Sequence, residues 1–71
     1  MNFNQLDFAT YCIGLISSVL GKSQKDVFNV LNSSGMLMSY IVSGYDVLHT
    51  FGREYLADDL ISYMTNKGIR I

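Results

Sequence analysis

The only histidine of this 71-residue chain, His49, follows Asp46 by three positions in the segment GYDVLHTFGREY, residues 44–55. A histidine oriented by an aspartate is a typical general base, and it could act on a water molecule or on the single cysteine, Cys12. The spacing argues against this pairing. If residues 47–50 are helical, Asp46 is the N-cap, and its carboxylate accepts a hydrogen bond from the backbone amide of His49 instead of its ring. We therefore predict no catalytic residue, and an enzyme that uses His49 is the least favoured function.

Cys12 lies on the apolar side of the first predicted helix, where a thiol is normally an inert small hydrophobe. A lone cysteine excludes an internal disulfide. One cysteine and one histidine cannot make a closed structural metal site. We expect no bound metal and no cofactor.

A structural interpretation makes the same segment a corner between helices. Gly44 would permit a positive φ, Asp46 would cap a short turn, and Thr50 would cap the long helix that follows. Val47 and Leu48 would then enter the core.

A third interpretation, compatible with the corner, is a surface for recognition. Aromatic rings that keep a polar group gather here beside a charged rim, which is the composition of an interface hot spot. Acidic residues outnumber basic ones in this region, which suits a basic partner. The predicted partner-binding residues are Tyr45, His49, Arg53, Glu54, Tyr55 and Asp58.

The elements that position this segment are predicted to be helices, in one all-α domain spanning residues 1–71. Apolar residues recur at steps of three and four over two long segments, about 5–20 and 51–67, and two or three short helices are expected between them. Gly68 should end the last helix, with Ile69 folding back on it.

Between the long helices, Ser23 is predicted to cap a second helix in a capping box with Asp26. Its buried side would be Val27, Phe28, Val30 and Leu31. The following MLMSYIV indicates a short buried helix with Leu37, Tyr40 and Ile41 inward, and its β-branched residues leave a strand as an alternative.

Composition narrows the function classes. The net charge is −1 and the five basic residues are scattered, so direct binding of nucleic acid is not expected. Only 14 residues separate Asp7 from Lys22, too few to span a bilayer, and the residues before them lack the positive charges of a signal peptide. We expect a cytoplasmic protein without a membrane partner.

The segment GYDVLHTFGREYLADDLISYM resembles a family of small bacterial domains of unknown function. The family's Tyr-Asp-x-Leu-His-Thr core corresponds to Tyr45–Thr50, its Gly-x-Glu-Tyr to Gly52–Tyr55, and its acidic pair to Asp58 and Asp59. SQKDVFNVL is similar to the family's Ser/Gly-Lys-Glu-Val-Tyr-x-Leu segment, so the likeness covers nearly the whole chain. Phe51 departs from the pattern, because members commonly have a polar residue there.

The resemblance implies a role as companion to co-encoded proteins, some of which look like ADP-ribosyltransferase-type toxins. The first hypothesis is therefore a non-catalytic, antitoxin-like or accessory protein that binds and neutralises such a partner. The alternative is a homo-oligomeric structural or regulatory domain. Self-association is expected because the first helix, together with Met36 and Met38, has more apolar surface than so short a chain can easily bury. If the corner does not bind the partner, the face of small residues on the first helix, around Thr10, Gly14 and Ser17, is the next expected interface.

Overall fold

The computed structural model describes residues 1–71, and every regular element in it is helical. This confirms the all-α prediction, with the two longest helices at the two ends, and the strand alternative for MLMSYIV is wrong. The elements are α1 (Phe3–Leu20), α2 (Gln24–Ser33), the π-helix η1 (Leu37–Val42), α3 (Tyr45–Leu48) and α4 (Arg53–Lys67).

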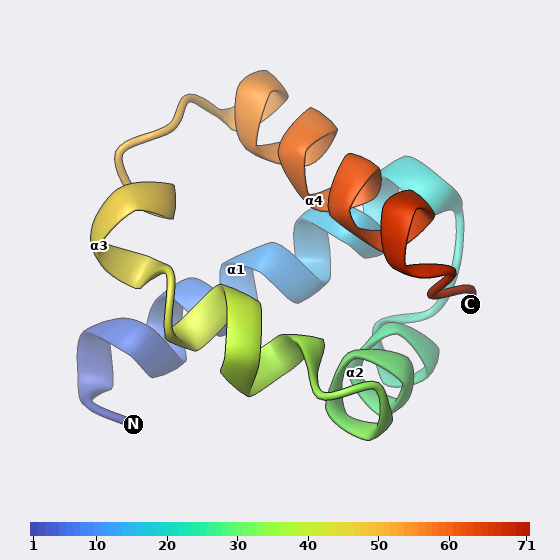
Figure 1. The fold of residues 1–71 in the computed structure, drawn as a ribbon, viewed down its shortest axis with the longest axis horizontal. Helices are drawn as coiled ribbons and strands as arrows, with labels where there is room; N and C mark the ends of the chain where they lie inside the picture. The colour runs from blue at the N-terminus through green and yellow to red at the C-terminus, as the bar shows by residue number, and fades with distance from the viewer.

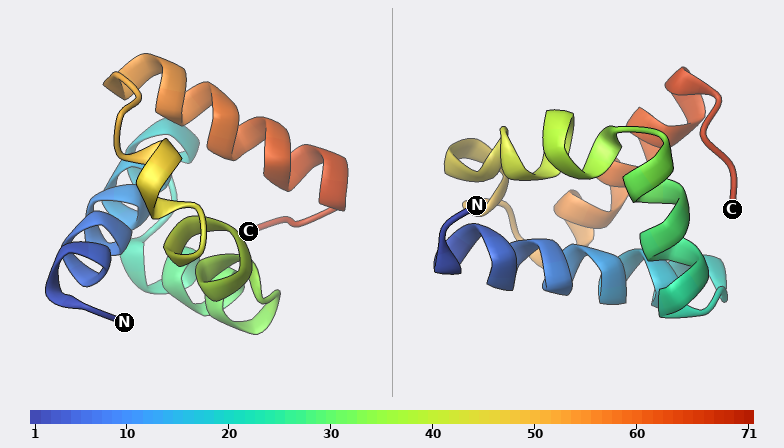
Figure 2. Two further views of the ribbon diagram at one scale, coloured as in Figure 1. Left: turned by 60° about the vertical axis from the view of Figure 1, so that its left-hand side comes forward. Right: turned by 90° about the horizontal axis from the view of Figure 1, so that it is seen from below.

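The helices form a hairpin-like layer that α4 crosses. Figure 2 (right) shows η1 and α3 running back alongside α1, with α2 closing the end between them. Helix α4 lies over this layer and packs on α1, and its C-terminal end returns to the α1–α2 connection (Figure 1). The α3–α4 corner therefore lies at the opposite end of the molecule from α2.

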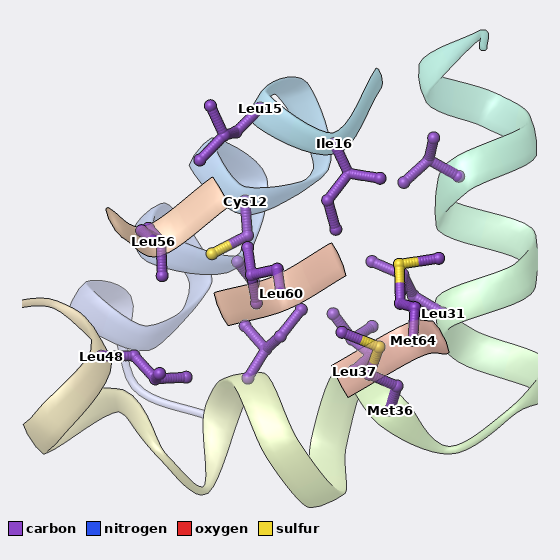
Figure 3. Packing of buried hydrophobic residues seen from close by; sticks show 13 residues of the cluster. Cys12, Leu15, Ile16, Leu31, Met36, Leu37, Leu48, Leu56, Leu60 and Met64 are labelled. Atoms are coloured by element: carbon purple, nitrogen blue, oxygen red, sulfur yellow. The ribbon is translucent and has the colours of Figure 1, made fainter. Parts of the chain in front are cut away.

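One apolar cluster fills the space between the two layers (Figure 3). Every helix contributes to it, so no element is an independent unit. Met36, which the sequence analysis assigned to exposed apolar surface, is buried here. The cluster consists of Ala9, Cys12, Leu15, Ile16, Val27, Leu31, Met36, Leu37, Ile41, Leu48, Leu56, Leu60 and Met64.

Helix α1 begins with a capping box that the sequence analysis did not identify. The Asn2 side chain accepts from the Gln5 amide at 2.8 Å, and the Gln5 side chain accepts from the Asn2 amide at 2.9 Å. These bonds satisfy two free amides and start the helix at Phe3 instead of near residue 5. Gly21 ends α1 in the left-handed conformation with φ 65°.

Ser23 is the N-cap of α2, as predicted, and accepts from the Asp26 amide at 3.1 Å. Only this half of the expected capping box forms. Val27 and Leu31 are buried, whereas Phe28 is exposed, so the apolar side of α2 is narrower than predicted. The predicted end of α4 is confirmed, because Gly68 has φ 70° and the Ile69 amide donates to the Met64 carbonyl at 2.9 Å.

Candidate functional site

The corner between η1 and α3 depends on Gly44, although not for the predicted reason. Its φ is −91°, outside the left-handed region, so the expected positive φ is wrong. A Cβ at this position would lie 2.6 Å from the Tyr40 carbonyl oxygen and 3.1 Å from Leu48 Cδ1. Gly44 is therefore needed because the backbone of η1 and the side chain of Leu48 come close.

Asp46 is not the N-cap of the turn. Helix α3 begins two residues earlier than expected, at Tyr45, and Gly44 is its N-cap. The His49 amide donates to the Tyr45 carbonyl at 3.0 Å, and not to Asp46. The Gly44 carbonyl accepts the amides of Val47 and Leu48, which fixes this earlier start and leaves Asp46 as an exposed residue of the first turn.

Thr50 is also not a cap for the long helix. Gly52, in extended conformation, is the N-cap of α4 without a side-chain bond. The Thr50 hydroxyl instead donates to the Val47 carbonyl at 2.6 Å, so it closes α3 and does not start α4. Leu48 enters the core as predicted, whereas Val47 is 62% exposed.

The rings of Tyr45 and His49 stack on the outside of α3. Their centroids are 4.4 Å apart with an interplanar angle of 8°, and the edge-to-face contact of Tyr45 with Phe8 at 5.5 Å holds the pair against α1. His49 Nδ1 lies 2.7 Å from the Tyr45 carbonyl oxygen. Because a carbonyl only accepts, Nδ1 carries the proton, and Nε2 is the nitrogen that remains for an external contact.

The structure does not bring His49, Asp46 and Cys12 together as a catalytic set. His49 is oriented by Tyr45 instead of Asp46. Cys12 is fully buried, and desolvation raises the pKa of its thiol to about 12, so it stays protonated at neutral pH. The thiol is part of the core packing.

The remaining predicted residues divide between two places on α4. Tyr55 is 64% exposed and packs edge-to-face on Phe51, with ring centroids 4.7 Å apart. Arg53 is exposed at the start of the helix. Glu54 and Asp58 point to another side, where they line a groove between α4 and α1.

This first groove is open and has a volume of about 640 Å³. Its walls combine two carboxylates with aliphatic side chains. They are Val19, Glu54, Ala57, Asp58, Ile61 and Ser62.

A second groove of about 310 Å³ continues beside the C-terminal half of α4. Ile61 lines both grooves, so they lie next to each other along α4. We call the joint surface the α1–α4 band. The second groove is lined by Leu20, Lys22, Ile61, Met64, Thr65, Ile69, Arg70 and Ile71.

On its other flank α4 forms a cluster that the sequence analysis missed. The Tyr40 hydroxyl donates to Asp59 Oδ2 at 2.5 Å, and the Tyr40 ring stacks on Tyr63 at 3.8 Å. Lys67 Nζ lies 5.8 Å from the centroid of the Tyr63 ring. The four-residue steps from Asp59 to Tyr63 to Lys67 were a visible signal for a shared face, but nothing in the sequence pointed to Tyr40 as their partner.

Comparison with known families places the chain in a family. The family model described as Protein of unknown function (DUF3791) matches residues 7–67. The chain belongs to the DUF3791 family. The match runs from the first turns of α1 to the last residue of α4, so this DUF3791 domain includes the corner and most of the α1–α4 band. No curated protein and no solved structure matches the chain.

Two further properties of the DUF3791 domain bear on its partners. No three side chains of histidine, cysteine, aspartate or glutamate are grouped so that they could hold a metal ion. None of the helices combines the length and the hydrophobicity that crossing a bilayer requires.

Proposed function

We propose that the DUF3791 domain is a non-catalytic interaction module that binds and neutralises a co-encoded protein, in an antitoxin-like or accessory role. The observation that carries the proposal is the α3–α4 corner. There Val47 and Tyr55 are 62% and 64% exposed, and the rings of Tyr45 and His49 stack on the same short helix as Val47. These are large apolar groups that the fold leaves in water.

The corner is preorganised for binding. His49 is held by ring stacking and by its bond to the Tyr45 carbonyl, and Tyr55 is held by Phe51. Side chains that are already fixed lose little conformational entropy on association. Tyrosine is also among the residues enriched at binding hot spots.

The partner would be basic at the surface it presents. Glu54 and Asp58 are exposed on the first turns of α4, on the side that faces the groove, and a partner that reaches from the corner over that side would be complementary to them if it were basic. The resemblance of the motif region implies a partner of the ADP-ribosyltransferase-toxin type. A cytoplasmic location belongs to the proposal, and the free thiol of Cys12 suits a reducing compartment.

Co-expression with the neighbouring reading frame tests the proposal. We expect the two proteins to co-purify, and the DUF3791 domain to relieve growth inhibition by that partner. Tyr45→Ala and Tyr55→Ala should each weaken binding by about thirty-fold, or about 2 kcal/mol, while circular dichroism stays helical. Tyr11→Ala, at an exposed tyrosine of α1, is the matched control. Corner variants that fold and bind like the parent would refute the assignment.

A second candidate role is a homo-oligomeric structural or regulatory domain. Met36 gives it no support because it is buried. The α1–α4 band does favour it, since Val19 and Leu20 at the end of α1 are 53% and 38% exposed beside Ile61. Aliphatic side chains gathered in this way often mark an interaction site.

A further inference from the structure

The two ends of the α1–α4 band carry opposite charge. Glu54 and Asp58 line the groove at the N-terminal half of α4, whereas Lys22 and Arg70 line the groove at its C-terminal half. The middle of the band, around Ile61, is aliphatic. One face of this small domain thus joins an acidic end, an apolar centre and a basic end.

The spacing along α4 makes this face complementary to itself. With a rise of about 1.5 Å per residue, Asp58 and Glu54 lie about 5 and 10 Å from Ile61 in one direction along the helix. The last turn of α4 lies in the other direction, and the chain beyond Gly68, which carries Arg70, folds back beside it. A two-fold axis through Ile61 would place the acidic end of one copy on the basic end of the other.

We propose that two copies of this chain associate through the α1–α4 band, with their α4 helices antiparallel and Ile61 at the two-fold axis. An isologous contact uses the same patch twice, so both charge matches form together. Antiparallel α4 helices also oppose their dipoles favourably. The inference specifies the self-association role proposed second and does not depend on the partner-binding role.

A contact of standard size would cover the α1–α4 band together with the surface around it. A standard interface covers about 800 Å² on each partner. That is about a fifth of the 4431 Å² exposed by the isolated chain, or one face of the molecule. A second copy is favoured over an unrelated helix because this chain itself carries the acidic, apolar and basic groups in the complementary order.

Family membership does not imply this dimer. Ile69, Arg70 and Ile71 lie beyond residues 7–67, which the family model matches. They form much of the wall of the second groove, and Arg70 supplies part of its positive charge.

Charge reversal tests the proposed symmetry. We expect sedimentation equilibrium of the parent to show a dimer whose dissociation constant rises with salt. The acidic-end variant Glu54→Lys/Asp58→Lys should raise that constant at least about tenfold by placing like charges together. The basic-end variant Lys22→Glu/Arg70→Glu should do the same. An equimolar mixture of the two variants should form a heterodimer, because both of its contacts then join opposite charges.

Asp7→Lys/Asp46→Lys is the matched control, since it changes net charge equally at exposed residues outside the band. It should dimerise like the parent and form no heterodimer with the basic-end variant. Circular dichroism checks that all variants remain helical. If neither charge reversal weakens the dimer, or if the mixture of variants stays monomeric, the proposed antiparallel arrangement is wrong, although the parent still self-associates. A strictly monomeric parent overturns both and leaves partner binding untouched.

Discussion

The two flanks of α4 use similar residue types in opposite ways. On the flank that faces η1, Asp59 accepts the Tyr40 hydroxyl and Tyr63 stacks on the Tyr40 ring. On the flank that faces the end of α1, Glu54 and Asp58 are exposed around the aliphatic Ile61. The first flank satisfies its polar groups inside the chain, whereas the second leaves them available to another molecule.

The adjacent acids Asp58 and Asp59 show how one helix produces both outcomes. In sequence they form a single acidic pair, but consecutive residues are about 100° apart around a helix. Asp59 therefore reaches Tyr40, and Asp58 reaches the groove beside Val19. An acidic pair in a helix is thus two separate sites whose roles depend on what packs on each side.

The largest expected change in stability compares a buried residue of α4 with a residue of the α1–α4 band. Leu60 is fully buried, so Leu60→Ala should lower the free energy of unfolding by about 3 kcal/mol through lost burial and a cavity. Ile61 is half-buried at the groove, and Ile61→Ala should lower it by about 1 kcal/mol. Urea denaturation at low protein concentration measures both. Equal losses would mean that Ile61 belongs to the core.

A substitution at Gly44 tests whether η1, which carries Tyr40, can move. Gly44→Ala forces a Cβ against the Tyr40 carbonyl, and we expect a loss of about 2 kcal/mol, within the range for overpacking. Gly14→Ala is the control, because the added Cβ meets only Gln24 Nε2 at 3.9 Å. In the middle of α1 this change should stabilise the protein by about 0.5–1 kcal/mol. A harmless Gly44→Ala would show that η1 can shift.

Tyr40→Phe removes the hydrogen bond from the Tyr40 hydroxyl to Asp59. It should lower the free energy of unfolding by about 1 kcal/mol at pH 7. Burial, followed by the hydrogen bond to Asp59, raises the pKa of Tyr40 from 10 to about 12. The folded state therefore holds the phenol proton more tightly than the unfolded state does. This contribution is complete below pH 10 and is lost as the pH rises through 12, so the difference between parent and variant should shrink over that interval. A constant difference would contradict the assignment. Urea titrations between pH 7 and 11.5 supply the measurement.

The smallest effects are expected at exposed acids. Asp46→Ala should change stability by only a few tenths of a kcal/mol, because Asp46 offers the short helix α3 a favourable charge but no cap bond. Asp58→Asn should be equally mild for folding, yet it should weaken the salt dependence of self-association. Thermal denaturation and sedimentation give the two readouts. A loss near 1 kcal/mol in Asp46→Ala would restore the capping interpretation.

The sequence was sufficient for the elements whose signals are local. Three- and four-residue spacing predicted α1 and α4, Ser23 marked the start of α2, and Gly68 marked the end of α4. Asn2 and Gln5 also carried a local signal, an Asn followed three residues later by a Gln, which was overlooked. These helix ends depend on residues within one turn of each other, so the residue types at a few neighbouring positions were enough to indicate them.

The errors lie at the corner, where several residues with the chemistry of a cap or a turn compete for the same helix ends. Asp46 and Thr50 both had the chemistry of a cap, but α3 begins at Tyr45, two residues earlier than a cap at Asp46 requires. Val47 is exposed, and the N-cap of α4 is Gly52 instead of Thr50. The sequence identified the types of the predicted interaction residues. It did not show that the aromatic residues lie at the corner whereas Glu54 and Asp58 line the groove.

The stacked pair of Tyr40 and Tyr63 has an optical consequence. The chain contains no tryptophan and five tyrosines, so its intrinsic fluorescence comes from tyrosine alone. A phenol that is hydrogen-bonded to a carboxylate and stacked on a second ring emits weakly, and both conditions hold for Tyr40. Fluorescence from this position should brighten when α4 separates from η1. The η1 flank thus provides a label-free reporter of whether the two layers of the domain are docked.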